Sequence, residues 1–412
     1  MMNISDDWAV PRLAERMATD FGLPEEILAV RKQARAFADD VLRPAAHDLN
    51  CTAERRDGFR HDIFKAIAAA GLYKIPYASD VGGAGLEFPV LATLTVMEEL
   101  AYYSAGVASA MFDGQAILVG KTLDQAGGAT REKWLPGIVQ GDYVAAFATS
   151  EPEASTDLSV ASLRTLAEPV DGGWRINGRK RWITNSVAAS RVLLLCRTGD
   201  TMTTFFVDMH AEGVSVSDPD LKMGNHAQLT ADILFENVFV TQEDVVGPVG
   251  GGLRTALSGL ALGRMGIGAA GVAMAQRALD VAVAYSSQRK VYGQPVAAFQ
   301  HWQFRFADHA LAIETARSLY QKAGANVDRG GASEPLAAMT KVKGSEVAVD
   351  VARDAIQSCG GYGFARELKG AERRFPLEAI YRDAKIGEIY EGANEVQRWV
   401  IARHLLGRAI TG

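Results

Sequence analysis

One carboxylate near the carboxyl end of the chain stands where it could act as a base. Glu391 lies between Tyr390 and Gly392 in the segment IYEGANEVQR. Asn394 and Gln397 match the capping-box pattern of a helix start, so Glu391 should precede that helix on a glycine-containing loop. Partial shielding from water would raise its pKa and suit it to act as a base near neutral pH. For this segment alone, a solvated surface acid is the commoner explanation.

Two segments in the middle of the chain carry side chains suited to a planar, oxygen-rich ligand. The segment FATSEPEASTD, 147–157, is a β-prone run that ends in hydroxyl side chains, and Pro152 stops strand pairing there. In RKRWITNS, 179–186, an indole at Trp182 is followed by a hydroxyl at Thr184, a combination that suits the face and edge of a planar ring. A polar loop is usually only a loop, but the second segment strengthens the ligand hypothesis.

Two later segments combine a helix end with groups that could approach a ligand. QRKVYGQPVAAFQ, 288–300, places Arg289 and Lys290 where they either offset a helix dipole or reach a pyrophosphate. QSCGGYGF, 357–364, places Gly360 and Gly361 at a helix end, where they allow close backbone approach or simply cap the helix. The residues alone leave both alternatives open.

A glycine pattern resembling a dinucleotide-binding motif occurs at 266–271, GIGAAG. That motif needs a strand before it and a helix opening at it, whereas here it lies inside a long helical pattern, so we interpret it as close helix packing. On the apolar face of the same predicted helix, Arg264 takes a position where an apolar residue is expected. A buried guanidinium needs a carboxylate, carbonyls or a bound anion, so Arg264 is either a site residue or half of an internal ion pair.

Length, composition and charge narrow the class of protein. A chain of 412 residues should form two or three domains, and 48% apolar with 22% charged residues fits a soluble globular protein. The net charge of −6 is not organised into basic clusters with aromatics, so we expect no nucleic-acid partner. The amino terminus lacks an apolar secretory core and contains acids, and apolar runs are short. We therefore expect a cytoplasmic protein without a membrane partner.

Cysteine and histidine usage argues against metal and disulfide frameworks. The chain has 3 cysteines, no two of which form a C-x-x-C motif, and 7 histidines, no two of which form an H-E-x-x-H motif. We predict no metal site.

The hydrophobic pattern changes twice along the chain and predicts three domains. Helical periodicity dominates 1–142, short β-prone runs dominate 143–249, and helical periodicity returns over 250–412 after three glycines. The middle domain should be an antiparallel barrel or sandwich, with tight turns at Asp171-Gly172 and Asn177-Gly178. The last domain should be a helix bundle. The expected fold class is mainly α with a central β-domain.

Five segments, in order and with similar spacing, resemble the hallmark blocks of the acyl-CoA dehydrogenase family. They are FATSEPEASTD, RWITNS, QRKVYGQPVAAFQ, QSCGGYGF and YRDAKIGEIYEGANEVQR. The resemblance spans nearly the whole chain. It implies an N-terminal helical domain, a middle β-domain and a C-terminal four-helix bundle, assembled as a homotetramer. It also implies FAD as cofactor, an acyl-CoA substrate and an electron-transferring flavoprotein as partner.

The resemblance assigns cofactor roles to individual residues. On the β-domain side the FAD would be lined by Phe147, Thr149, Ser150 and Thr156, with Trp182 and Thr184 flanking the isoalloxazine ring. The nucleotide part would be reached, partly from a neighbouring subunit, by Arg289, Tyr292, Gln300, Gln357, Gly360 and Gly361. The segment Ala393, Asn394 and Glu395 would close over the cofactor.

Glu391 falls on the family's catalytic base. It would remove the pro-R α-proton of an acyl-CoA thioester while a β-hydride passes to the flavin, with the thioester carbonyl polarised by the N–H of Glu391 and a ribityl hydroxyl. Some members instead carry the base beside the arginine that matches Arg264, but that position is Gly263 here. Tyr390, Gly392 and Arg264 would contact the substrate.

Three departures from the family pattern concern the pocket and the reaction type. Ser155 replaces a glycine of the pyrophosphate turn, and the segment 365–374 is longer than usual. Phe112 aligns near the floor of the acyl cavity, which would favour short, branched or cyclic acyl groups.

The alternatives to a dehydrogenase are an acyl-CoA oxidase or other oxygen-using flavoenzyme on the same fold, and a non-catalytic acyl-CoA-binding protein.

Overall fold

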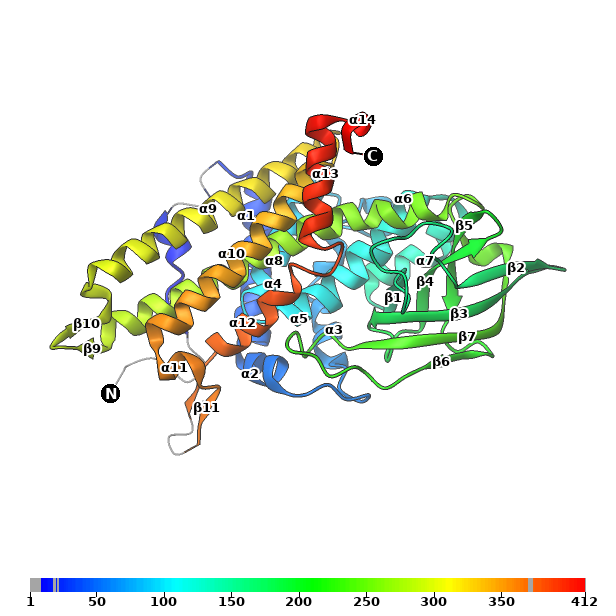
Figure 1. Cartoon of the computed structure of the whole chain (residues 1–412). Coiled ribbons are helices and arrows are strands. Elements are labelled where there is room, and N and C mark those ends of the chain that lie inside the picture. The colour runs from blue at the N-terminus through cyan, green and yellow to red at the C-terminus, as the bar shows by residue number, and fades with distance from the viewer. Residues whose placement is uncertain (1–8, 18–19, 21, 370–372, 412) are drawn as a thin grey trace.

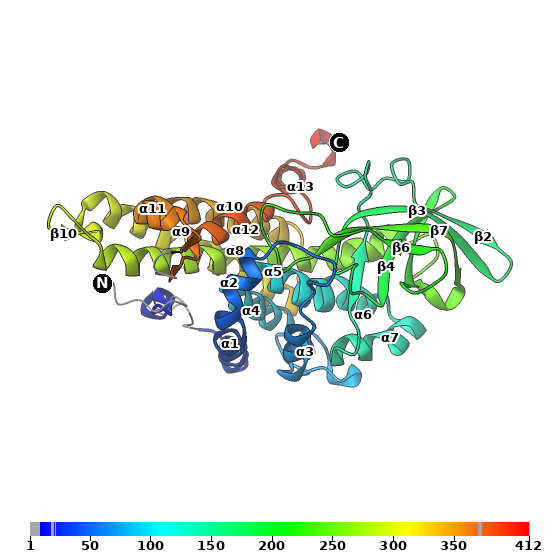
Figure 2. The same cartoon turned by 90° about the horizontal axis from the view of Figure 1, so that it is seen from below.

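A computed structural model describes residues 9–17, 20, 22–369 and 373–411. The chain forms a helical region, then a β-sheet, then a bundle of long helices, in the order that the sequence predicts (Figure 1). The view from below in Figure 2 shows the N-terminal helices on one side of the bundle and the sheet at one end of it. The active-site candidates come from all three regions.

The N-terminal region is a layer of helices whose apolar faces pack inward. In α1 (Glu25–Phe37) two acids occupy the first turn and the buried side chains recur every three or four residues, as predicted. The other helical elements are η1 (Leu13–Met17), η2 (Ala38–Leu42), α2 (Arg43–Cys51), α3 (His61–Ala69), η3 (Leu72–Lys74), η4 (Ser79–Val81), α4 (Pro89–Ala101), α5 (Ala105–Val107), η5 (Ala108–Lys121), α6 (Thr122–Ala126) and α7 (Gly128–Gln140).

The element η5 is a π-helix of 14 residues, almost all of them buried. The π-helix is rare and usually appears as a single turn, frequently at functional sites. Its wider backbone turn changes which side chains face a neighbour compared with an α-helix of the same sequence. This register decides which residue of η5 borders the active-site cleft.

The middle region is one 8-stranded sheet in the order β6-β7-β3-β2-β4-β5-β8, with β1 paired to β4. Its strands are β1 (Ala145–Ala148), β2 (Leu166–Val170), β3 (Gly173–Thr184), β4 (Arg191–Thr198), β5 (Thr201–Asp208), β6 (Val214–Val216), β7 (Thr230–Thr241) and β8 (Val245–Val246), and η6 (Gln242–Asp244) lies between the last two. The prediction of a wholly antiparallel sheet is wrong, because β1 and β2 both pair with β4 in parallel. The sheet is mixed.

One of the two predicted tight turns is also wrong. Asp171-Gly172 does connect β2 to β3, but β3 continues through Asn177-Gly178 with a register shift against β7. A Cβ at Gly178 would lie 2.5 Å from the Cα of Thr165. This glycine therefore permits close approach of a neighbouring backbone inside a strand.

The C-terminal region is a bundle around α8 (Gly252–Gln288), α9 (Gln300–Asp328) and α10 (Leu336–Cys359). The smaller elements are β9 (Lys290–Val291), β10 (Gln294–Pro295), η7 (Val296–Ala298), α11 (Gly361–Phe364), β11 (Glu367–Leu368), β12 (Arg373–Arg374), α12 (Leu377–Ile386), α13 (Asn394–Leu406) and α14 (Arg408–Thr411). By length and composition α8 could cross a membrane, but 72% of its apolar window is buried inside the protein, as in a core helix.

The glycines of GIGAAG serve helix packing, as predicted. A side chain at Gly268 would overlap Thr340 of α10, and one at Gly271 would overlap the backbone of Gly344. The two helices therefore approach each other more closely than larger residues would allow. This contact fixes the position of α8, which carries Arg264.

Candidate active site

A cleft of about 720 Å³ lies where the sheet, η5, the start of α8 and α13 meet. Its volume is within the range of small-molecule sites, which is roughly 300–1,000 Å³. The predicted site residues that line it are Phe147, Thr149, Ser150, Thr156, Trp182, Thr184, Arg264, Tyr390, Glu391 and Gly392. The structure thus brings together residues from segments far apart in the sequence.

Glu391 is placed in this cleft by a short turn between α12 and α13. Its backbone has a φ of 54° and that of Gly392 a φ of 92°, so two consecutive residues are left-handed. A left-handed conformation is uncommon for a residue with a side chain and is found preferentially at functional sites. A Cβ at Gly392 would lie 2.5 Å from the Nε2 of Gln397, so a larger residue there would displace the end of that side chain.

The carboxyl group of Glu391 occupies the space above Gly263 of α8. A Cβ at Gly263 would overlap Glu391 Oε2 and lie 2.8 Å from a methyl carbon of Leu118. A side chain at position 263 and the carboxyl of Glu391 therefore compete for the same volume. The glycine at 263 therefore leaves the space that the carboxyl of Glu391 occupies.

Arg264 holds the turn that carries Glu391. Its Nε donates a hydrogen bond of 3.1 Å to the carbonyl oxygen of Glu391. Its guanidinium also lies 4.0 Å from the carboxylate of Glu334. Of the two explanations open in the sequence, the structure favours a site residue, because Arg264 lines the cleft and fixes the backbone of Glu391.

Burial dominates the electrostatics of Glu391. Its Oε2 is buried, and loss of water raises the pKa of the carboxyl above its usual value; a hydrogen bond with Asp113 and the charges of Arg264 and Lys341 partly offset this rise. Lys341 has its own pKa lowered to about 8 by burial. The result is an acid whose pKa is closer to neutral than that of a surface glutamate.

The predicted capping box at the start of α13 is wrong. The N-cap residue is Ala393, and no side chain in the described part of the chain caps the helix. The Asn394 side chain is buried and accepts a hydrogen bond of 2.9 Å from Lys341 Nζ, while Gln397 donates one of 3.2 Å to the carbonyl of Gly392. Tertiary partners inside the bundle therefore replace the local cap. Asn394 fixes the turn, and Ala393 and Glu395 flank it.

The opposite wall of the cleft comes from the end of β3. Trp182 has a φ of 57° and is 56% exposed, so its indole projects from the strand. Thr184 accepts a hydrogen bond of 2.9 Å from the amide of Gln228. An exposed indole next to an oriented hydroxyl fits a flat, polar-edged ring system such as the flavin of FAD. The residues present therefore fit the cofactor that the resemblance implies.

A buried ion pair holds the loop that follows β1. Lys180 Nζ lies 2.9 Å from Glu151 Oε1 and donates a hydrogen bond of 3.0 Å to the carbonyl of Thr149. Glu151 also accepts hydrogen bonds from the N–H groups of Arg164 and Thr165. The hydroxyl-bearing residues at 149–156 are thus held at the edge of the cleft by the sheet beneath them.

The prediction that Phe112 forms the cavity floor is wrong. Phe112 is fully buried in the N-terminal core, where its ring stacks on Tyr73 at 6.3 Å between centroids. The π-helical register of η5 instead turns Asp113 and Ser109 toward the cleft. Sequence reasoning missed both, although Asp113 is the only charged residue between 105 and 119 and was a visible signal.

The residues predicted to reach the nucleotide part of FAD lie elsewhere. Arg289, Tyr292 and Gln300 cluster around the β9–β10 hairpin, and Gln357, Gly360 and Gly361 lie at the end of α10, at the end of the bundle remote from the sheet (Figure 1). Tyr292 is 94% exposed there. The structure does not bring this group to the cleft within one chain.

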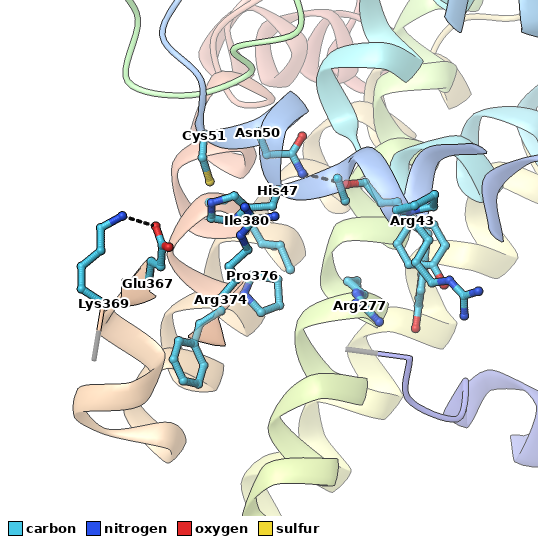
Figure 3. Close-up of a pocket in the computed structure, with 16 residues that line it drawn as sticks. Arg43, His47, Asn50, Cys51, Arg277, Glu367, Lys369, Arg374, Pro376 and Ile380 are labelled. Carbon is cyan, nitrogen blue, oxygen red and sulfur yellow. Dashed lines mark hydrogen bonds and ion pairs between the residues drawn. The ribbon is translucent and has the colours of Figure 1, made fainter. Parts of the chain in front are cut away.

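A second pocket, of about 560 Å³, lies between α2, α8 and α12 (Figure 3). It is lined by Arg43, His47, Arg277 and Arg374 among others, and by no predicted site residue. Residues 370–372 lie outside the described part of the chain. The described ends of the long segment 365–374 border this pocket, through Glu367 and Arg374, and do not line the cleft.

Comparison with known proteins agrees with this geometry. Family models for the N-terminal, middle and C-terminal domains of acyl-CoA dehydrogenase match residues 24–142, 146–238 and 250–406. The chain belongs to the acyl-CoA dehydrogenase family, and it is an oxidoreductase of that class.

Individual relatives cover almost the whole chain. A 3-(aryl)acrylate reductase of Clostridium sporogenes is 35% identical over 92% of this chain and 97% of its own length. The mouse mitochondrial short-chain specific acyl-CoA dehydrogenase is 34% identical over 93% of this chain and 91% of its own length. The solved structure of butyryl-CoA dehydrogenase from Megasphaera elsdenii has a TM-score of 0.87 at 32% identity and covers 94% of this chain and 100% of that chain.

Proposed function

We propose that the protein catalyses FAD-dependent α,β-dehydrogenation of a short acyl-CoA thioester, with Glu391 as the base. The observation that carries the proposal is the carboxyl of Glu391, buried in a cleft over Gly263 and held by a left-handed turn. The short acyl group is supported by relatives named short-chain specific and butyryl-CoA dehydrogenases. FAD is supported by the wall of the cleft at Trp182 and by a structural neighbour solved as an FAD complex.

In this proposal the chain itself performs the proton transfer. The carboxylate of Glu391 accepts the α-proton, and its raised pKa reduces the mismatch with that weakly acidic carbon. The N–H of Glu391 has no acceptor among the residues that the structure describes, so it is available to polarise the thioester carbonyl. When bound, FAD supplies the acceptor for the hydride that leaves the β-carbon.

The assembly and the redox partner are further parts of the proposal. The residues expected to bind the nucleotide part of FAD lie far from the cleft, which supports a site completed by a second subunit and is compatible with a homotetramer. An electron-transferring flavoprotein as acceptor is supported by structural similarity to a chain in a structure of the electron transferring flavoprotein of Acidaminococcus fermentans, with a TM-score of 0.87. We propose a cytoplasmic location.

Replacing Glu391 by Gln tests the role of the base. Glu391→Gln should bind FAD as the wild type does, while anaerobic bleaching by butyryl-CoA should slow by at least about a hundredfold, because general-base groups contribute roughly 10²–10⁴-fold. Glu388→Gln, a change of the same kind three residues earlier that loses an exposed ion pair with Lys385, is the control and should bleach normally. Bleaching of Glu391→Gln at a near-native rate would exclude Glu391 as the base.

The similarity to 3-(aryl)acrylate reductase favours one second candidate, reduction of an α,β-double bond. The same base and cleft serve either direction of the reaction. Turnover of an enoyl substrate with a reduced dye, faster than acyl-CoA oxidation with an oxidised dye, would favour this candidate. Rapid turnover with oxygen alone would instead indicate an oxidase, and absence of all turnover a binding protein.

A further inference from the structure

Asp113 is a second buried acid in the cleft, and the proposed reaction does not use it. It is 1% exposed and lies on η5, facing the cleft. Its Oδ1 lies 3.2 Å from the position that a Cβ of Gly266 would occupy, one turn of α8 beyond Gly263. The carboxyl groups of Asp113 and Glu391 are within hydrogen-bonding reach of each other.

Two ionised carboxylates are both hydrogen-bond acceptors, so they cannot form a hydrogen bond with each other unless one of them is protonated. Asp113 Oδ1 and Glu391 Oε2 are both buried, and among the described residues neither finds a hydrogen-bond donor. Two charged carboxylates in contact repel, and each would also remain a buried acceptor without a partner. If the pair holds a single proton, the repulsion is removed, and the protonated carboxyl donates a hydrogen bond to the ionised one.

The charged neighbours decide which of the two keeps the proton. Burial raises the pKa of both acids, but the charges of Arg264 from α8 and Lys341 from α10 partly offset this rise at Glu391. Asp113 has no such offset: burial and the charge of Glu391 both raise its pKa, well above the usual value. Tyr390, on the same turn as Glu391, has its phenol within 3.1 Å of the Ser109 hydroxyl. Beside Asp113 near Gly266 lie the apolar side chains of Met97 and Ile117, and the amide of Asn185 lines the cleft. The proton therefore belongs on Asp113.

We propose that Asp113 is a positioning residue that stays protonated and donates a hydrogen bond to Glu391, keeping the base ionised and aimed inside a buried cleft. The inference rests on the proposed function for the role of Glu391. The pair holds one proton before the reaction and two after Glu391 has taken the α-proton. Asp113 acts through Glu391 and does not itself need to touch the substrate.

An infrared measurement tests the protonation state without any catalysis. At neutral pH the purified protein should show the C=O stretch of a protonated carboxylic acid, and Asp113→Asn should lose that band. Asp280→Asn is the matched control, because Asp280 is another buried acid, bonded to Tyr102 and Gln276 away from the cleft. The band should survive in this control and in Glu391→Gln. A wild-type spectrum with no band sensitive to Asp113→Asn would overturn the proposal.

The pH profile of flavin bleaching tests the effect on the base. Asp113→Leu removes the donor, so the pKa of Glu391 should rise and the acid limb of the profile should move to higher pH, with about a tenfold loss at neutral pH for each pH unit moved. Asp113→Asn keeps a donor and should leave the limb close to that of the wild type. Asp280→Asn should not move it.

The outcomes separate this proposal from the proposed function. An unmoved acid limb in Asp113→Leu, or equal shifts in the Leu and Asn variants, would overturn the role of Asp113. Normal bleaching by Glu391→Gln would instead refute the base and leave the infrared result to decide the shared proton. Loss of the band in Asp113→Asn together with a shifted limb only in Asp113→Leu supports the proposal in full.

Discussion

Two groups of buried acids in this protein have opposite electrostatic environments. Glu98 of α4 accepts hydrogen bonds of 3.0 Å from Arg31 and 2.9 Å from Arg317, and a further one from the phenol of Tyr320. Despite burial, these partners lower the pKa of Glu98 to about 2. Asp113 and Glu391, in contrast, share the cleft with each other.

The difference shows what each group does for the molecule. The cluster at Glu98 ties α1, α4 and α9 together, and all its acid oxygens receive donors. The acids in the cleft retain oxygens that receive no donor from the residues that the structure describes, and their pKa values are raised. A fully paired acid is an inert structural link, whereas an incompletely paired acid costs stability and gains basicity.

The largest effect on stability is expected in the cluster. Glu98→Gln leaves the guanidinium of Arg317, which is 1% exposed, without its main counter-charge. Breaking a buried ion pair in this way costs about 3–5 kcal/mol in free energy of unfolding. Urea denaturation followed by circular dichroism would measure it.

The control for that experiment is an exposed ion pair. Glu346 pairs with Arg398 at 2.5 Å at the surface. Glu346→Gln should change the free energy of unfolding by less than about 1 kcal/mol. Equal losses in Glu98→Gln and Glu346→Gln would show that the cluster at Glu98 does not anchor the helices.

A second prediction concerns the cleft and activity. Gly263→Ala adds a methyl group where Glu391 Oε2 now lies, so the carboxyl must move. Displacing a reacting group by about 1 Å can cost on the order of a hundredfold in rate, and we expect that loss in flavin bleaching by butyryl-CoA. Gly259→Ala, one turn earlier on α8, where the added methyl would meet the Thr122 hydroxyl, is the control. A loss in the control as large as in Gly263→Ala would attribute the effect to helix packing.

The order of helical, β and helical regions and the residues around the cleft could be predicted from the sequence. Hydrophobic periodicity identifies the helices, and the hallmark segments carry Trp182, Arg264 and Glu391, all of which line the cleft. These features depend on local pattern or on the hallmark segments of the family.

The errors arose where tertiary contacts override local pattern. Asn394 matches a cap by sequence but binds Lys341 from another helix, and Asn177-Gly178 matches a turn but lies inside β3. Asp113 faces the cleft in place of Phe112 because η5 is a π-helix. A pattern based on 3.6 residues per turn does not detect this change of register. The sequence shows the acid at Asp113, but such a pattern does not place it in the cleft.

The last prediction concerns how the stability of the two groups of acids changes with pH, which should have opposite signs. Glu98 has a lowered pKa when folded, so its contribution to stability is present above about pH 4.5 and is lost as the pH falls toward about 2. Asp113 has a raised pKa in the folded state. Above pH 3.8, the usual pKa of the group, the unfolded chain has released this proton while the folded protein still binds it. The contribution of Asp113 to stability therefore falls as the pH rises above 3.8.

Denaturation of two variants across this pH range would measure both signs. The stability deficit of Glu98→Gln relative to the wild type should shrink on acidification below about pH 4.5. Asp113→Asn should gain stability relative to the wild type as the pH rises from 4 to 7, because the wild type loses stability over this range and the amide does not titrate. If the stability of Asp113→Asn relative to the wild type does not depend on pH, Asp113 titrates as it does in the unfolded chain, and the contrast between the two groups of acids would be lost.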